Sequence, residues 1–455
     1  MLPKTVLNRF VEQCPAVVMV RATLENLLRP ERIDQIFEQT AKRQYSRGLL
    51  FSHLVALMSA VATRTHRSVR AAYLDAQAQL GVSATAVYDK LNRLEPALSA
   101  ALIREIARDA AQVIDAMPHA RREVLPGRDV YFLDGNHLAA SEHRLAVTRV
   151  TREGPLPGQT LALLDGQRGL IVELEPCEDG HAQERSLLPA LLERLEPGMV
   201  IVADRNFCTT QFLFGLHRRD VDFIIRQHGS TLIWKLLGKR RRVGRCATGM
   251  VYEQAVELTE GQHTLRVRRI TVELDQPTES GETEIHLLSG LPAAAASAIQ
   301  IAQAYRQRWT IEGAFQQLTD VLCCEVKTLG YPKAALFAFA TAVLAYNTYA
   351  VARAALRSAH GVEVIEEQLS DYHLLTHVAQ AHVGLEIAVD STAWIPYQRL
   401  TSPQLAEELL RLSQQVRLAR YPKTKRGPKK PRPARKSGHR NHHVATARLL
   451  AKQPK

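Results

Sequence analysis

The chain has few cysteines and no arrangement of them that would cross-link it or bind zinc. Its 455 residues include six cysteines, none of them in a C-x-x-C pair. This spacing indicates neither a disulfide framework nor a zinc site. We therefore expect reduced thiols and an intracellular protein.

Long apolar segments are also missing. Arg9 and Glu12 interrupt the apolar stretch at the N-terminus, so this region lacks the apolar core of a secretory signal peptide. The most apolar run, residues 334–346, has only 13 residues before Asn347. This is too short to span a bilayer and is typical of a buried helix. We expect no membrane partner.

Acidic residues are absent from the C-terminal end. The formal charge is +13, but twelve cations lie in residues 421–455, so 47 cations face 46 anions in residues 1–420. The basic tail is broken by prolines and almost free of apolar residues before Val444, which predicts disorder. It is either an arm for a nucleic-acid backbone, which we favour, or a tail that only aids solubility. The segment HVATARLL near its end has room for one or two amphipathic turns.

The first 120 residues have the apolar spacing of helices and few strand-forming residues. Residues 69–80 and 84–94 are predicted to form two helices joined by a tight turn, with Ser83 capping the second. The second helix carries a polar face, which suits a helix-turn-helix that meets a DNA groove. An ordinary pair of antiparallel helices is an equally good interpretation.

From about residue 128 the pattern changes to short β-rich runs separated by polar segments. A helix-like stretch at residues 184–195 lies among them, so an α/β layer is expected. Alternating segments between about 231 and 290 predict a β-rich insertion, after which helices resume to about residue 420. The strands are expected at residues 130–133, 160–164, 170–174, 199–203, 221–225, 251–258 and 264–274.

Two aspartates follow predicted strands, and one glutamate follows the predicted insertion. Asp134 comes after the run YFL and Asp204 after VIVA, at strand ends where α/β sheets place ligands and catalytic groups. With Glu312 they form a carboxylate set that suits Mg²⁺ or Mn²⁺. Two such ions can activate a nucleophile and stabilise the leaving oxygen of a phosphodiester. Taken singly, each Asp is more often a turn or cap residue, and Glu312 a surface or ion-paired one.

Tyr305, Arg308 and Glu312 have the spacing i, i+3 and i+7 in the stretch YRQRWTIEGAFQQLT. On one continuous helix these positions fall within roughly a 60° stripe. The stripe therefore predicts a carboxylate flanked by a phenol and a guanidinium.

Three sequence blocks resemble the DDE transposases of the insertion-sequence-four group. They are DGNHL at 134–138, ADRNF at 203–207 and YRQRWTIEGAF at 305–315, and the resemblance covers about residues 125–350. The third block is similar to that family's signature of Tyr, two residues, Arg, three residues, Glu, six residues and Lys. Thr319 stands at the Lys position, and Asn206 stands where such transposases often carry Gly.

This resemblance implies an RNase-H-like catalytic core in which Asp134, Asp204 and Glu312 hold Mg²⁺. It also implies that Tyr305 and Arg308 contact phosphates beside the scissile bond. The neighbouring residues have open alternatives. Trp309 either stacks on an unpaired base or packs in the core, which is the commoner role, and Arg205 meets DNA or pairs with a carboxylate. The cationic cluster on the insertion contacts DNA or is merely solvated, and it comprises Lys239, Arg240, Arg241, Arg242 and Arg245. Cys323 and Cys324 are expected in buried packing on the continuation of the Glu312 helix.

The expected fold is an α/β protein whose RNase-H-like core carries a β-rich insertion between the second Asp and the Glu, flanked by helical N- and C-terminal regions. The expected parts are a DNA-end-binding region at 1–125, the core in two pieces at 126–230 and 291–355, the insertion at 231–290, a helical region at 356–420 and the basic tail at 421–455.

The function that follows is a prokaryotic DNA transposase, cytoplasmic and associated with the nucleoid. It would cut element ends and join their 3′-hydroxyls to target DNA, working as a homodimer on double-stranded DNA. The alternatives are a metal-dependent nuclease or an inactive transposase relic, and a DNA-binding protein without catalysis. A glycosidase with paired carboxylates is a distant further alternative because it leaves the basic tail unused.

Overall fold

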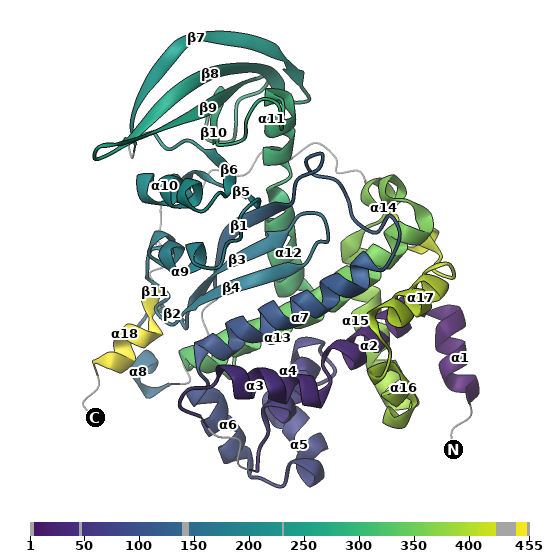
Figure 1. Cartoon of the computed structure of the whole chain (residues 1–455). Coiled ribbons are helices and arrows are strands. Elements are labelled where there is room, and N and C mark those ends of the chain that lie inside the picture. The colour runs from purple at the N-terminus through teal and green to yellow at the C-terminus, as the bar shows by residue number, and fades with distance from the viewer. Residues whose placement is uncertain (1–3, 45–47, 139–144, 230–231, 425–442, 453–455) are drawn as a thin grey trace.

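A computed structural model of the chain describes residues 4–44, 48–138, 145–229, 232–424 and 443–452. Figure 1 shows a helical body at the bottom, a mixed sheet in the middle and a curved antiparallel sheet at the top. The N-terminal helices are α1 (Lys4–Gln13), α2 (Pro15–Leu27), α3 (Pro30–Thr40), α4 (Phe51–Ala62), α5 (Val69–Leu80), α6 (Ala84–Arg93) and α7 (Pro96–Asp115).

The α5–α6 pair forms as its local signals predict. Gly81 ends α5 in a left-handed conformation with φ +62°, a conformation that glycine adopts readily. The Ser83 side chain accepts a hydrogen bond from the Ala86 N–H at the start of α6, which is the expected cap. These contacts fit a helix-turn-helix and an ordinary helical hairpin alike.

The central sheet has nine strands in the order β4-β3-β1-β5-β6-β10-β9-β8-β7. Its first five strands are β1 (Val130–His137), β3 (Gln159–Asp165), β4 (Ile171–Cys177), β5 (Val200–Ala203) and β6 (Asp222–Arg226). β1 is parallel to β5, and β5 is parallel to β6, whereas β3 is antiparallel to both β1 and β4. The mixed α/β expectation is confirmed, and this sheet with its helices is consistent with an RNase-H-like transposase fold.

Four antiparallel strands between β6 and the next helix extend the sheet. They are β7 (Ile233–Cys246), β8 (Gly249–Glu260), β9 (His263–Leu274) and β10 (Glu284–Ser289). They occupy the part of the sequence where alternating segments predict a β-rich insertion. Figure 1 shows them curving away from the helical body.

The alternation of side chains along the strands creates a separate core on each face of the sheet. Phe132 and Val202 pack with the long helices on one face. Leu133 and Ile201 pack on the other face, in the cluster that includes α9 and α10. The short elements among these strands are α8 (Ala146–Arg149), β2 (Gly154–Leu156), η1 (Glu184–Leu187), α9 (Leu188–Leu192), η2 (Arg205–Phe207) and α10 (Thr210–Arg218).

The helices after the sheet are α11 (Ala298–Arg306), α12 (Trp309–Asp320), α13 (Pro332–His360), α14 (Val362–Gln368), α15 (Asp371–Ala388), η3 (Ser391–Trp394), α16 (Ile395–Gln398), α17 (Ser402–Ser413) and η4 (Leu418–Arg420). Of these helices, α11, α12 and α13 contact the strands of the sheet, and α14–α17 pack on other helices. α13 lies beside α7, and α7 packs on β4 (Figure 1).

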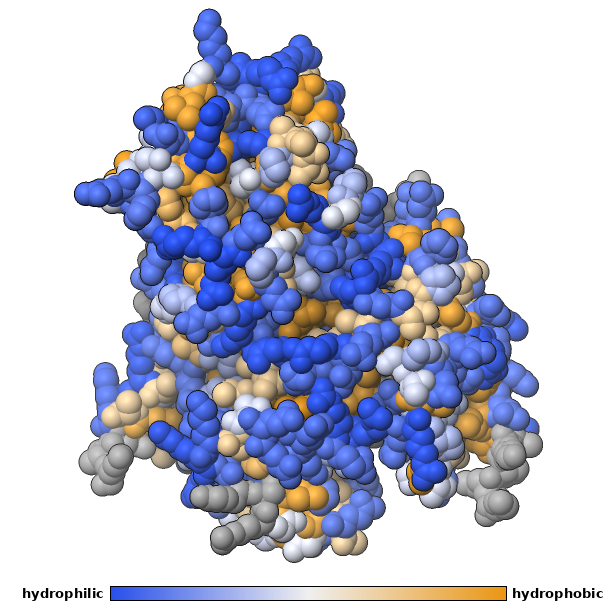
Figure 2. Space-filling view, in the orientation of Figure 1, coloured by the Kyte–Doolittle hydropathy of each residue, from blue (hydrophilic) through white to orange (hydrophobic). Residues whose placement is uncertain are grey.

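α13 is the one helix in the described residues long and apolar enough to cross a membrane. Its 29 residues extend well beyond the apolar run seen in the sequence, and its most apolar 18-residue window is entirely buried in the protein. Hydrophilic side chains predominate on the face shown in Figure 2. The burial of α13 is that of a core helix.

The C-terminal end departs from the prediction of a disordered tail at both of its margins. Tyr421 is buried, and its carbonyl accepts a hydrogen bond from the Ser370 N–H at 2.9 Å. Farther on, β11 (His443–Ala445) pairs in parallel with β2 and leads into α18 (Thr446–Ala451). Arg448 anchors α18 to Asp179 with an Nε–Oδ2 distance of 2.7 Å. The most basic part, residues 425–442, lies outside the described residues.

Candidate active site

The alternation of β1 determines where the first carboxylate points. Asp134 shares a face with Phe132, two positions earlier, and therefore lies on the side of the sheet covered by α12. Its Oδ1 accepts a hydrogen bond from the Gly135 N–H at 3.0 Å. Its Oδ2 is 3.2 Å from Nη1 of Arg308.

The second carboxylate lies at the end of the neighbouring strand. Asp204 follows β5 directly and caps η2, because its Oδ1 accepts a hydrogen bond from the Asn206 N–H at 2.7 Å. The parallel pairing of β1 with β5 ends at Leu133 and Ala203, so the next residues, Asp134 and Asp204, lie close together. Asp204 therefore both caps η2 and lies at the candidate site, so the two roles expected from the sequence are compatible. The prediction that Asp134 follows its strand is wrong, because β1 continues to His137 and pairs with β3 beyond this point.

Arg308 connects the first carboxylate to the third. Its Nη2 is 2.7 Å from Oε1 of Glu312, so one guanidinium bridges Glu312 and Asp134. The Arg308 side chain is only 10% exposed, whereas that of Glu312 is 35% exposed. Nε of Arg308 is buried and has no hydrogen-bond partner among the described residues.

The three residues of the predicted stripe do not lie on one continuous helix. α11 ends at Arg306 and α12 begins at Trp309. Between them the N–H groups of Arg308 and Ile311 donate to carbonyls three residues back, those of Tyr305 and Arg308. Three residues per turn place positions i and i+3 almost directly above one another. Tyr305 and Arg308 therefore still share one side, although the helix is interrupted.

The electrostatics of the site reflect burial first and neighbouring negative charge second. Burial raises the pKa of Asp134 to about 6, the carboxylates of Asp204 and Glu312 add to this, and Arg308 opposes it. Burial also raises the pKa of the Tyr305 phenol. The Arg308 guanidinium has a raised pKa despite its burial because Tyr305, Asp134 and Glu312 stabilise its positive charge.

No ready metal cage exists in the part of the chain that the structure describes. There, no three His, Cys, Asp or Glu side chains lie close enough together to hold a metal ion. Arg308 instead neutralises two of the three candidate ligands. The site therefore has the charge that a cation would balance, with a guanidinium in that role.

A fourth carboxylate lies beside the site, and no feature of the sequence singles it out. Oε1 of Glu184, in η1, would lie 2.0 Å from a Cβ placed on Gly135. Its Oε2 accepts a hydrogen bond from Nδ2 of Asn206 at 2.5 Å. Arg185 donates from Nε to the Asn206 carbonyl at 2.8 Å. Asn206 thus links η1 to Asp204. A glycine at this position would keep the backbone contacts with Asp204 and Arg185 but lose the side-chain contact with Glu184.

Trp309 is not packed in the core. It is 66% exposed, and the Arg308 guanidinium carbon lies 5.3 Å from the centre of its ring. Cys323 and Cys324 lie beyond the end of α12 rather than on it, with Cys324 buried and Cys323 half-buried. Thr319 is exposed, and its hydroxyl donates to the Phe315 carbonyl at 3.0 Å.

The predicted cationic cluster lies away from these residues, on the edge strand β7. Much of its charge is paired: Arg240 with Glu284 at 2.9 Å and Arg241 with Glu253 at 3.0 Å. Arg245 pairs similarly with Asp275, and Arg242 Nε lies 3.1 Å from Sδ of Met250. Lys239 is exposed and has no ion pair within the described residues. Arg205 lies 3.4 Å from Oε1 of Glu282, and its side chain is 55% exposed.

Comparison with known families bears on the class of this protein. Residues 149–348 match the family model described as a transposase DDE domain. The matched range contains Asp204 and Glu312 and begins after Asp134. No curated protein matches the sequence. The domain match supports a DDE transposase, which is an enzyme of the nuclease and transposase type that acts on DNA.

Proposed function

We propose that this protein is the transposase of an insertion sequence of the insertion-sequence-four group. It cuts the phosphodiester bond at each element end and joins the freed 3′-hydroxyl to target DNA. Asp134, Asp204 and Glu312 are its catalytic carboxylates. The family match supports the class, and the arrangement of these three residues supports the assignment within the chain.

One observation carries the proposal. Arg308 contacts Asp134, a residue 174 positions earlier in the chain, and also Glu312 one helical turn away. An ordinary surface ion pair on a helix would explain the contact of Arg308 with Glu312, but it would not explain the contact with Asp134. Here β1 and the start of α12 place Asp134 and Glu312 around one guanidinium, and Asp204 at the end of β5 is close enough to raise the pKa of Asp134. Asp204 and Glu312 fall within the matched transposase domain, and Asp134 precedes it.

The oxygen-only donor set fits a hard divalent cation such as Mg²⁺, with Mn²⁺ as a substitute. The pKa of Asp134, which burial and its carboxylate neighbours raise to about 6, signals unbalanced negative charge that a cation would relieve. Asp134, Asp204 and Glu312 would hold the metal once Arg308 releases at least one of them. When bound, the metal supplies activation of the attacking oxygen and stabilisation of the leaving one.

The flanking side chains bind and orient DNA. A released Arg308 is free to pair with the phosphate beside the scissile bond, and the buried Tyr305 phenol holds its position. Trp309 exposes its ring next to this guanidinium, as expected of a residue that stacks on an unpaired base. Lys239 and Arg242 on β7, with Arg205 near the site, contact the DNA backbone. Two copies of the chain bring two element ends together.

The test uses purified protein, Mg²⁺ and DNA carrying the ends that flank its own gene. Wild type should cleave and join these ends, and Glu312→Gln should lose both activities by about 10³-fold or more, as when charge stabilisation is removed from an active site. Asp320→Asn is the matched control, because it removes an exposed carboxylate from the same helix. An active Glu312→Gln variant would rule out this site.

Thr319 favours a second candidate, a nuclease or an inactive relic. A Lys here would supply a phosphate contact, but Thr319 brings no charge and its hydroxyl already bonds to Phe315. A nuclease would nick the ends without joining them, and a relic would bind them without cutting. Recovery of joining in Thr319→Lys would identify the missing charge as the cause.

A further inference from the structure

A second polar cavity lies on the opposite side of α12 from the candidate active site. It has a volume of about 300 Å³, which is at the lower end for small-ligand pockets. Thr310, Gly313 and Gln317 line it from α12. These positions have the spacing i, i+3 and i+7, which places them on one helix face, roughly opposite to that of Glu312.

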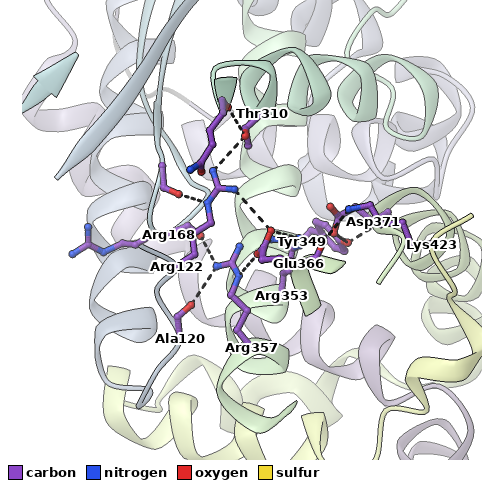
Figure 3. A network of polar contacts seen from close by, with 12 residues as sticks. Ala120, Arg122, Arg168, Thr310, Tyr349, Arg353, Arg357, Glu366, Asp371 and Lys423 are labelled. Carbon is purple, nitrogen blue, oxygen red and sulfur yellow. Dashed lines mark hydrogen bonds and ion pairs between the residues drawn. The ribbon is translucent and has the colours of Figure 1, made fainter. Parts of the chain in front are cut away.

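Positive charge exceeds negative charge around this cavity. Figure 3 shows three guanidiniums gathered around one carboxylate, that of Glu366. Arg353 binds it through two contacts of 2.7 and 3.1 Å, Arg357 through Nε at 2.9 Å, and Arg122 at 3.8 Å. The charged groups that line the cavity are Arg122, Arg353, Arg357, Lys423, Glu366 and Asp371.

The three guanidiniums are largely buried, so solvent relieves the imbalance only in part, whereas Lys423 is exposed. The Arg357 side chain is 1% exposed and that of Arg122 is 13% exposed. Burial, together with the nearby Arg353, lowers the pKa of Arg357 to about 10. Although burial opposes it, the same guanidiniums bring the pKa of Glu366 down to about 2. Three largely buried guanidiniums therefore share two carboxylates, those of Glu366 and Asp371, in a partly dry environment.

Donors remain for a further anion. Tyr346 lines the cavity, is 7% exposed, and its hydroxyl has no hydrogen-bond partner among the residues described. The hydrogen bonds of Arg357 within that part of the chain use Nε and Nη1, which leaves Nη2 available. Tyr349, the other tyrosine of the cavity, differs because its hydroxyl already donates to Asp371 at 3.2 Å.

We propose that this cavity binds a phosphate group, through Arg122, Arg357 and the hydroxyl of Tyr346. The group is either part of a DNA backbone or a free phosphate. A phosphate bound in this cavity would hold α12 against α13. Glu312 lies on the opposite face of α12. The proposal goes beyond the chemistry proposed for Asp134 and Glu312, and its first test uses neither DNA nor a metal.

The test compares thermal unfolding of the full chain in inorganic phosphate and in chloride at equal pH and ionic strength, with calorimetric titration of phosphate to obtain Kd. Phosphate should raise the melting temperature of wild type specifically. Tyr346→Phe should weaken phosphate binding about tenfold or more, the effect of one hydrogen bond to a charged group. Arg122→Gln should abolish it, and the matched Tyr349→Phe should retain it.

The source of the phosphate follows from competition with a short DNA duplex. If the cavity takes a backbone phosphate, duplex DNA displaces inorganic phosphate, and Tyr346→Phe weakens DNA binding. If it takes a free anion, duplex DNA and inorganic phosphate bind at the same time, and Tyr346→Phe leaves the affinity for DNA unchanged. The proposal is overturned if phosphate stabilises wild type no more than chloride does. It is equally overturned if both Tyr346→Phe and Arg122→Gln keep the full response.

Discussion

Replacing Asp134 by Asn should stabilise the fold while it abolishes catalysis. The pKa of this buried carboxyl is raised to about 6 from its ordinary value of 3.8. That difference corresponds to about 3 kcal/mol of free energy that the folded protein loses when Asp134 ionises. Asn has nearly the same shape and carries no charge, so the variant avoids this loss.

The sign of the pH dependence follows from the same values. Because the folded-state pKa is the higher one, the folded protein binds the Asp134 proton more tightly than the unfolded chain does. The free energy of unfolding of wild type therefore falls, relative to the variant, as the pH rises from about 3.8 to about 6. The advantage of Asp134→Asn should be small at pH 4 and up to about 3 kcal/mol at pH 8.

The assay is urea-induced unfolding of both proteins at pH 4 and pH 8, without divalent metal, followed by circular dichroism. Asp320→Asn serves as the control for the loss of one negative charge. It should change the free energy of unfolding by a similar amount at both pH values. An advantage of Asp134→Asn that is equal at pH 4 and pH 8 would refute the reasoning. Added Mg²⁺ should stabilise wild type more than the variant.

Three further predictions concern the surroundings of the site. Trp309→Ala should change the free energy of unfolding by less than about 0.5 kcal/mol, because the ring is exposed, yet slow cleavage about tenfold in a strand-cutting assay. Lys239→Ala should lower the salt dependence of DNA binding by about one in logarithmic slope; Arg240→Ala, which loses its contact with Glu284, should affect stability instead. Gly135→Ala should reduce cleavage by displacing Glu184, and the added change Glu184→Ala should relieve the steric conflict; no rescue in that double variant would contradict the proposed contact.

Local signals in the sequence were sufficient for much of the fold. The β-rich runs before Asp134 and Asp204 became strands because short continuous runs of β-branched and aromatic residues suit a sheet buried on both faces. Ser83 formed the predicted cap because capping depends on a few neighbouring residues. The pairing of Asp134 with Arg308 was not predicted, because no local rule brings together two residues 174 positions apart in the chain.

Other features were decided only when distant segments met. The break between α11 and α12, the exposure of Trp309 and the approach of Glu184 to Gly135 depend on packing between elements far apart in sequence. The C-terminal strand β11 forms because β2 offers it a partner, which a basic, Pro-rich composition cannot reveal.

The sequence by itself identified the candidate site residues: three carboxylates, a phenol and a guanidinium, each in or beside a recognisable strand or helix. Tertiary structure alone decided their electrostatics. Burial against α12 raises the pKa of Asp134, and the guanidinium of Arg308 balances two of the carboxylates that we propose as metal ligands. Charge interactions depend on distance and desolvation, and both are properties of the folded chain.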